Sequence, residues 1–422
     1  MKYVLSMFVC LIVLNALVPG PANASEQPTP PSATGEQGKP PVGEIEATTP
    51  DSPDAAGTES DVPTLVKRLS DSNPNLRAAA ARRLGQLGPQ AVEAVPSLIR
   101  ALEDDGYPDI GDPVWILAAK ALGKMGSKAV PQLIDPLQSP DPHVTKGVAA
   151  ALGDIGPAAS EAVGALIAAL EKDDPQTRIT LLYGLKGIGP GADPAVPLLI
   201  QLLSHDDFHT RYWACQALGG IGPAAAAAVP ALCRLTTDGP ASVRRHAAAA
   251  LGSIGPAIGP PGLDALVKAL RDPVDPVRQD AVAALGKLGE LAKPAVAEIQ
   301  AAIREGKMST LAGSAHTLWQ LTRDPDVVVP VLIEDLNRFG TSPEAARMLG
   351  ELGEAAKAAV PELAKNLQSS DPLLRFEAAR ALGRIGPAAQ TAVPALQRAL
   401  EDESLDVRQA AQTSLKQIEP ST

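Results

Sequence analysis

Large aromatic side chains are scarce in this chain. Its 422 residues include four Phe, four Tyr and three Trp, which together make up 3%. A core built from stacked rings is therefore excluded, and the apolar interior has to come from Ala, Leu, Val and Ile. Alanine runs such as Ala78 to Ala81 and Ala247 to Ala250 supply small residues where helices can pack closely.

Positive charge is also in short supply. Lys and Arg total 37 against 48 Asp and Glu, which gives a net charge of −11. Binding to nucleic acid needs Lys and Arg concentrated near the phosphates. We therefore predict that nucleic acid is not a partner.

The short motifs of common enzymes are missing as well. The chain has five His and three Cys, and it contains no Gly-x-Ser-x-Gly, phosphate loop, Cys-x-x-Cys or His-Glu-x-x-His sequence. From these absences we predict no catalytic residues, no cofactor and no enzymatic activity.

The best candidate for a metal site is the segment from His205 to His209, which reads His-Asp-Asp-Phe-His, together with His246. Such side chains bind hard and borderline cations. The same segment also fits the acidic turn of a repeat, and we therefore predict no metal site. Cys215 and Cys233 occupy positions that other repeats fill with apolar residues, so we expect buried free thiols, although an exported protein could form a disulfide.

What the chain does have is a repeat of about 33 residues. Eleven times it returns to an anchor Leu in a phrase that most often reads Leu-Gly-x-Ile-Gly, and we number the repeats by these anchors: Leu84, Leu122, Leu152, Leu185, Leu218, Leu251, Leu285, Leu318, Leu349, Leu382 and Leu415. Successive anchors lie 30 to 38 residues apart. This period is typical of stacked helix pairs. It predicts an all-α, right-handed alpha-alpha superhelix of about eleven helix pairs.

Each repeat contains signals for the ends of two helices. Ala-Val-Pro begins at Ala94, Ala129, Ala195, Ala228, Ala359 and Ala392, so each first helix should start or kink at its proline. The second helix is predicted to open on an acidic cap followed by proline at Asp141, Asp174, Asp275 and Asp371. It should end on the last glycine of the anchor phrase.

These phrases resemble those of the HEAT-repeat superfamily. Ala-Val-Pro, Asp-Pro-x-Val-Arg and Ala-Leu-Gly-x-Ile-Gly resemble the phycobilin-lyase-type HEAT-like repeats in particular, over roughly residues 61–419. The resemblance implies a helical solenoid. It does not by itself imply one function, since such solenoids serve many roles.

The N-terminal residues predict export. Lys2 precedes an apolar run from Val4 to Val18, and Ala22-Asn23-Ala24 before Ser25 fits the small-x-small rule for cleavage. We expect a signal peptide at 1–24, a disordered Pro-rich acidic linker at 25–60 and the solenoid at 61–419, in a periplasmic or extracellular protein that does not insert in a membrane after cleavage. An uncleaved anchor is the alternative.

Arginine recurs seven residues before the anchor in seven repeats, at Arg77, Arg178, Arg211, Arg244, Arg278, Arg375 and Arg408. This column could form a basic stripe that binds anions. It could instead form a ladder bonded to the acidic turns, which the family resemblance also implies. We favour the ladder, because the nearby acids would neutralise a stripe.

Positions −6, −5, −2 and +2 from the anchor point away from the buried stripe of the second helix and should line the concave face. In repeats four to six the candidate partner-binding residues at these positions are Ile179, Tyr183, Tyr212, Trp213, Gln216, Arg245 and His246. Aromatic residues and Arg are favoured at binding hot spots. The alternative is that Tyr212 and Trp213 pack between neighbouring repeats.

We therefore expect an exported, non-enzymatic scaffold that binds a protein or peptide on its concave face. The alternative is a lyase-like or other accessory enzyme built on HEAT-like repeats. Repeat two, with an insertion from Gly106 to Asp112, and repeat eight, with Trp319 in place of a glycine, depart from the pattern and could bind a partner or only change the curvature.

Overall fold

The computed structural model describes residues 61–306, 308, 311–339 and 342–419. These residues form eleven successive helix pairs and contain no strand, which confirms the predicted alpha-alpha superhelix. The predicted signal peptide and linker fall in residues 1–60 and lie outside the described residues.

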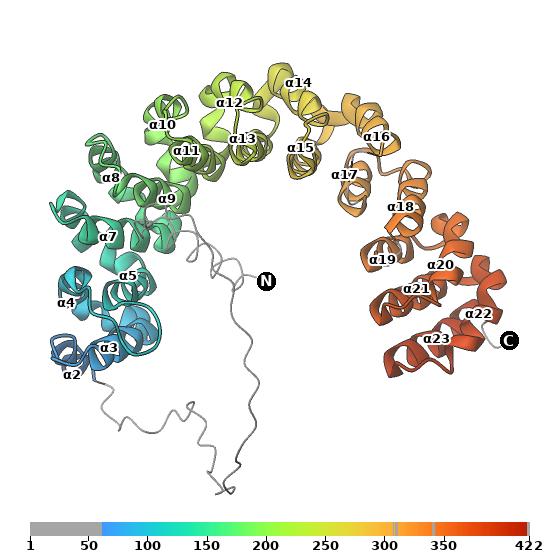
Figure 1. Ribbon diagram of the computed structural model, residues 1–422, viewed down its shortest axis with the longest axis horizontal. Coiled ribbons are helices and arrows are strands. Elements are labelled where there is room, and N and C mark those ends of the chain that lie inside the picture. The colour runs from blue at the N-terminus through green and yellow to red at the C-terminus, as the bar shows by residue number, and fades with distance from the viewer. Residues whose placement is uncertain (1–60, 307, 309–310, 340–341, 420–422) are drawn as a thin grey trace, which may run out of the picture.

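The pairs stack into an open arc (Figure 1). The first helices lie on the outside of the arc; they are α2 Val62–Arg68, α4 Val95–Arg100, α6 Val130–Leu133, α8 Val163–Leu170, α10 Val196–Leu202, α12 Val229–Leu235, α14 Gly259–Ala269, α16 Val296–Arg304, α18 Pro325–Phe339, α20 Val360–Asn366 and α22 Val393–Ala399.

The second helices line the inside of the arc, as predicted (Figure 1). They are α3 Pro74–Leu87, α5 Val114–Lys124, α7 Pro142–Ile155, α9 Arg178–Ile188, α11 Phe208–Ile221, α13 Ala241–Ile254, α15 Asp275–Lys287, α17 Ala312–Thr322, α19 Pro343–Leu352, α21 Pro372–Ile385 and α23 Leu405–Ile418. Ten of the eleven anchor leucines are buried in the continuous core between the two layers, and Leu415 in the last repeat is half-buried.

The predicted helix starts are largely correct. A short 3-10 segment precedes most first helices, and Ala-Val-Pro places its proline in the first turn of the helix without a kink. Asp141 and Asp371 cap their second helices as predicted. The other two caps differ: α9 begins later, at Arg178, and Asp275 lies inside the first turn of α15.

The two glycines of the anchor phrase have different roles. The last glycine ends the second helix with a positive φ, as at Gly156 (75°) and Gly222 (73°), a conformation that favours glycine. The first glycine lets neighbouring second helices approach closely. A Cβ added at Gly252 would lie 2.7 Å from the Cα of Ala284 on the next second helix, which is too close for an ordinary contact.

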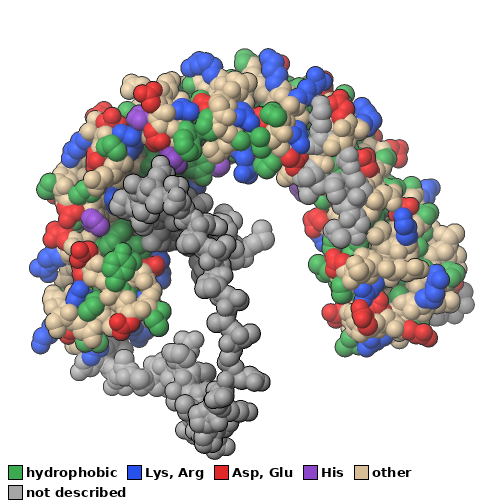
Figure 2. Space-filling view, viewed as in Figure 1, with side chains coloured by type: hydrophobic (Ala, Val, Ile, Leu, Met, Phe, Trp, Pro, Cys, Tyr) green, Lys and Arg blue, Asp and Glu red, His purple; other side chains and the backbone are tan. Residues whose placement is uncertain are grey.

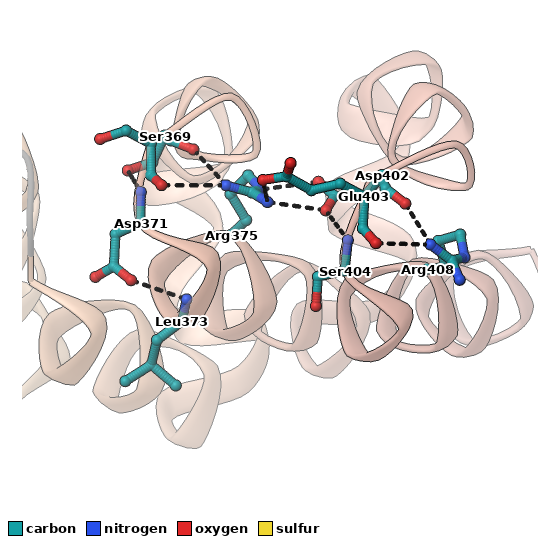
Figure 3. A network of polar contacts seen from close by, with 9 residues as sticks. Ser369, Asp371, Leu373, Arg375, Asp402, Glu403, Ser404 and Arg408 are labelled. Carbon is teal, nitrogen blue, oxygen red and sulfur yellow. Dashed lines mark hydrogen bonds and ion pairs between the residues drawn. The ribbon is translucent and has the colours of Figure 1, made fainter. Parts of the chain in front are cut away.

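The arginine column forms the predicted structural ladder. Nε and Nη2 of Arg244 donate to the carboxylate of Asp272 in the next repeat at 2.6 and 2.9 Å, and Nη1 donates to the carbonyls of its own turn. The same arrangement recurs at Arg77, Arg211 and Arg375. Figure 3 shows Arg375 between its own turn and Asp402. The column therefore connects one repeat to the next.

Repeat eight interrupts this regular stacking. Trp319 and Thr322 replace both glycines, and α17 ends instead at Arg323, which has a φ of 53°. Within the described residues α17 packs mainly against α15 and α18. On α18, the buried carboxylate of Asp335 accepts hydrogen bonds from the Leu311 amide (3.1 Å) and the Ser342 hydroxyl (2.6 Å). These two residues occupy the arginine column, so Asp335 connects repeats eight and nine.

By length and composition, one stretch of the described residues resembles a membrane span, from Phe208 to Leu235. It comprises α11, a 3-10 segment and α12, which change direction at Gly222, and half of its apolar window is buried inside the solenoid. It is therefore a pair of core helices.

Candidate functional site on the inner surface

Four ring-bearing residues meet on the inner side of α9, α11 and α13. We call Tyr183, Tyr212, Trp213 and His246 the inner aromatic cluster. The Trp213 ring makes edge-to-face contacts with Tyr183 (6.1 Å between centroids) and Tyr212 (5.5 Å), and Tyr212 lies against the His246 ring at 4.2 Å. Side chains from three successive repeats thus form one continuous patch.

Polar contacts fix the edges of the inner aromatic cluster. The Tyr183 hydroxyl donates to Asp154 on α7 at 2.7 Å. Arg245 forms an ion pair with Asp280 on α15, with 2.7 Å between Nε and Oδ2. His246 Nδ1 lies 2.8 Å from the carbonyl oxygen of Ser242. The cluster is therefore bonded to repeat three through Tyr183, and the adjacent Arg245 is bonded to repeat seven.

Lys186 stands over the middle of the inner aromatic cluster. Its Nζ lies 5.6 Å from the Trp213 ring centroid, a cation–π contact, and donates to the amide oxygen of Gln216 at 2.6 Å. Within the described part of the chain Lys186 has no carboxylate partner. A cation beside a set of rings, without a counter-ion of its own, suits an anionic ligand that carries a flat apolar body.

Burial shifts the pKa values of several groups in the patch. Desolvation lowers the pKa of Lys186 and of His246, and it raises the pKa of the Tyr212 hydroxyl. For His246 the hydrogen bond to Ser242 acts in the opposite direction but is the weaker effect. Surrounding protein also raises the pKa of Asp154, although this side chain keeps an exposed surface, which favours a small shift.

The seven predicted partner-binding residues do lie together, but they are not equally accessible. Ile179, Tyr183, Tyr212, Gln216, Arg245 and His246 are half-buried. Trp213 is 4% exposed and belongs to the core, so it does not line the concave face as a solvent-facing residue, and the alternative that it packs between neighbouring repeats holds for this side chain. The reason is that its ring leans between α9 and α11, where Tyr183, Tyr212 and Lys186 cover it. Whether these residues bind a partner stays a prediction.

Sequence reasoning missed Lys186. The signal was present, because Lys186 follows the anchor Leu185 at the position where most repeats have glycine. The close approach is instead made by the next residue, Gly187, whose added Cβ would lie 2.2 Å from the carbonyl oxygen of Gly153. The long side chain of Lys186 is thereby free to extend across the inner surface.

Side chains of the candidate metal site make hydrogen bonds within their own turn. His205 Nδ1 accepts a hydrogen bond from the Asp207 amide, and Asp207 caps α11. Among the described residues no group of three His, Cys, Asp or Glu could hold a metal ion. His205 occupies the position that Asp238 holds in the next repeat, where it pairs with Arg211. Because His205 offers no carboxylate, Arg178 bonds instead to Asp173 in its own turn and to the Thr210 hydroxyl.

The two cysteines among the described residues, Cys215 and Cys233, are free thiols. Cys215 is fully buried as predicted, and Cys233 is half-buried with its sulfur 3.7 Å from a backbone carbonyl oxygen. Burial raises the pKa of both thiols, which makes them poor nucleophiles.

Acidic and basic side chains are interspersed over the face of the arc shown in Figure 2, with no continuous basic stripe. This agrees with the ladder interpretation of the arginine column, in which most of the guanidinium groups pair with a nearby carboxylate.

Comparisons with known proteins agree with this architecture. The profile described as HEAT repeats matches residues 51–111, 112–186, 163–252, 230–318 and 341–416. The chain belongs to the HEAT-repeat family. Importin beta is a solved structure with the same fold, with a TM-score of 0.60, 16% identity, and coverage of 85% of this chain and 58% of importin beta.

Relatives of known function indicate which kind of HEAT-repeat protein the chain resembles. The phycocyanobilin lyase subunit alpha of Nostoc sp. strain PCC 7120 is 37% identical over 111 residues, which cover 26% of this chain and 40% of the relative. The corresponding subunit of a Picosynechococcus strain is 43% identical over 83 residues, or 19% of this chain and 31% of the relative. The predicted resemblance to phycobilin-lyase-type repeats is confirmed. The chain spans less than half the length of these relatives.

These relatives overturn our prediction that the chain is not an enzyme, because they are named as lyase subunits. That prediction rested on the absence of short catalytic motifs. In a solenoid, groups that meet on the inner surface come from successive repeats about 33 residues apart, so they leave no short motif in the sequence.

Proposed function

We propose that this chain is a lyase-like subunit that holds an open-chain tetrapyrrole of the phycocyanobilin type against the inner surface of repeats four to six. The observation that carries the proposal is Lys186, which lies over the inner aromatic cluster and has no ion-pair partner within the described residues. The names of the curated relatives point to the same ligand class.

The chemistry of the patch fits this ligand. Phycocyanobilin has a flat conjugated body and propionate side chains. The half-buried rings of Tyr183, Tyr212 and His246 offer apolar faces to the body, and Trp213 supports them from below. Lys186 can then pair with a propionate, because its ammonium group is partly desolvated and carries no carboxylate of its own.

A lyase also needs the protein to which the pigment is joined or from which it is released. The inner surface of the solenoid extends on both sides of the inner aromatic cluster, and extended surfaces of this kind suit a protein partner. The relatives are named as subunits, which favours action together with a second chain.

The test is a titration of the purified protein with phycocyanobilin, followed by the absorbance of the pigment. We expect binding by the wild type and about tenfold weaker binding by Lys186→Gln, because a charge-assisted contact is lost. The matched control is Lys128→Gln, which removes an exposed lysine from the 3-10 segment before α6. Equal affinity of the wild type and Lys186→Gln, or no binding at all, would remove the proposal.

Activity needs a separate measurement. A pigment-free biliprotein, the pigment and this chain should give more covalently coloured protein than a reaction without the chain, as judged on denaturing gels. Pigment that binds but is never transferred, even with the subunits of the relatives added, would limit the role to pigment binding.

A further inference from the structure

A hollow lies on the inner surface at the C-terminal end of the arc. It has a volume of about 380 Å³ and lies between α21 and α23, and its lining includes Phe376, Arg380, Arg384, Asp406, Gln409 and Gln417. Neither the inner aromatic cluster nor Lys186 contributes to it. We call it the C-terminal cleft.

The walls of the C-terminal cleft are two lines of side chains in register. Phe376, Arg380 and Arg384 follow one another at intervals of four residues along α21, so they form one line on that helix. Gln409, Thr413 and Gln417 do the same along α23. Because α21 and α23 are equivalent helices of successive repeats and pack directly together, the two lines run side by side.

One of the three charged side chains that line the C-terminal cleft already has a partner. Arg380 donates to Glu377 at 3.1 Å, and its guanidinium lies 5.2 Å from the Phe376 ring centroid. Arg384 and Asp406 differ: both are exposed, and among the described residues neither forms a hydrogen bond or an ion pair through its side chain. Two side chains of opposite charge therefore face the same cleft without partners.

These two charges lie at opposite ends of the C-terminal cleft. Arg384 and Gln417 both follow their anchors by two residues and are therefore level with one another, whereas Asp406 lies in the first turn of α23. The rise from Asp406 to Gln417 is about 16 Å at 1.5 Å per residue. An extended chain covers that distance in about five residues at 3.3 Å each.

We propose that the C-terminal cleft binds an extended peptide segment that carries a basic side chain against Asp406 and an acidic side chain about five residues away against Arg384. The Gln409 amide lies between the two charges, and the Gln417 amide lies level with Arg384. Neither amide has a hydrogen-bond partner within the described residues. A primary amide both donates and accepts, so it can bond the N–H and C=O groups of the intervening peptide. The inference does not depend on pigment binding at repeats four to six.

The test uses two labelled peptides of the same composition and fluorescence anisotropy with the full chain. In the first peptide a Lys and a Glu are five residues apart in a Gly/Ser background, and in the second they are adjacent. We expect the first to bind at least about tenfold more tightly, since only it reaches both charges.

The variants Arg384→Gln and Asp406→Asn should each weaken binding of the first peptide about tenfold. The matched controls are Arg398→Gln on the outer helix α22 and Glu401→Gln in the turn after it, both exposed, which make the same charge changes away from the cleft. Circular dichroism should be used to check that each variant is folded. The proposal is overturned if the peptides bind equally, if neither binds, or if only one of the two cleft variants weakens binding.

Discussion

Replacement of Trp213 by Ala separates a structural from a surface role in the inner aromatic cluster. Trp213 is 4% exposed, and its ring contacts Tyr183, Tyr212 and Lys186. Loss of a buried Trp side chain leaves a cavity and costs about 3 to 5 kcal/mol of unfolding free energy. Tyr212 is half-buried, so Tyr212→Ala should cost less, about 1 to 2 kcal/mol.

The measurement is urea unfolding followed by far-UV circular dichroism, which does not depend on the removed fluorophore. Tyr107→Ala is the control, because Tyr107 is 70% exposed and its loss should be close to neutral. A cost below about 1 kcal/mol for Trp213→Ala, or a larger cost for Tyr212→Ala, would refute the packing described above. A second probe of unfolding is needed, because long repeat arrays can depart from two-state behaviour.

Three further predictions concern the scaffold, and a fourth concerns the N-terminus. Gly187→Ala should destabilise the fold by several kcal/mol in the urea unfolding described above, because the added Cβ meets the backbone of the neighbouring helix. Gly313→Ala, with nothing within 4 Å of the added Cβ, should be neutral or stabilising. Hydrogen bonds from Arg375 hold the pKa of Asp402 below its usual value near 4. The contribution of Asp402 to stability should therefore be present above about pH 4 and be lost at lower pH, and Asp402→Asn should lack this part of the acid transition. Burial lowers the pKa of His246, so stability should fall as the pH drops below about 6.5, and a Gln variant should show a flatter profile of melting temperature against pH. N-terminal sequencing of the exported protein should begin at Ser25, and recovery of the initiating Met would contradict the predicted cleavage.

The repeat could be predicted from the sequence because each structural requirement has its own residue. The positive φ after each second helix needs glycine, the close approach of helices needs another glycine, and the ladder needs Arg with an acid in the next turn. These requirements recur with the period of the fold. The number of helix pairs, their layers and the ladder followed from them.

The site was harder to predict, because it lies where single residues depart from the repeat. A helical wheel places Trp213 on the inner, solvent-facing side of α11 but cannot show that its ring leans over the neighbouring helix. In most repeats the glycine directly after the anchor Leu makes the close helix contact. In repeat four Gly187 makes this contact instead, so the preceding position can hold Lys186, which reaches the cluster. The irregular repeat eight likewise depends on Asp335, which accepts hydrogen bonds from Leu311 and Ser342 in the arginine column, where neither residue has the guanidinium that other repeats use.

The central claim is that the inner aromatic cluster holds the pigment, and Trp213 can report on it directly. Trp115→Phe and Trp319→Phe together leave Trp213 as the single tryptophan of the chain. Titration of this variant with phycocyanobilin should quench the Trp213 fluorescence to an end point of one pigment per chain, because the bound pigment would lie against the residues that cover the Trp213 ring. Unchanged Trp213 fluorescence in a folded protein that has bound the pigment would place the pigment elsewhere and contradict the account.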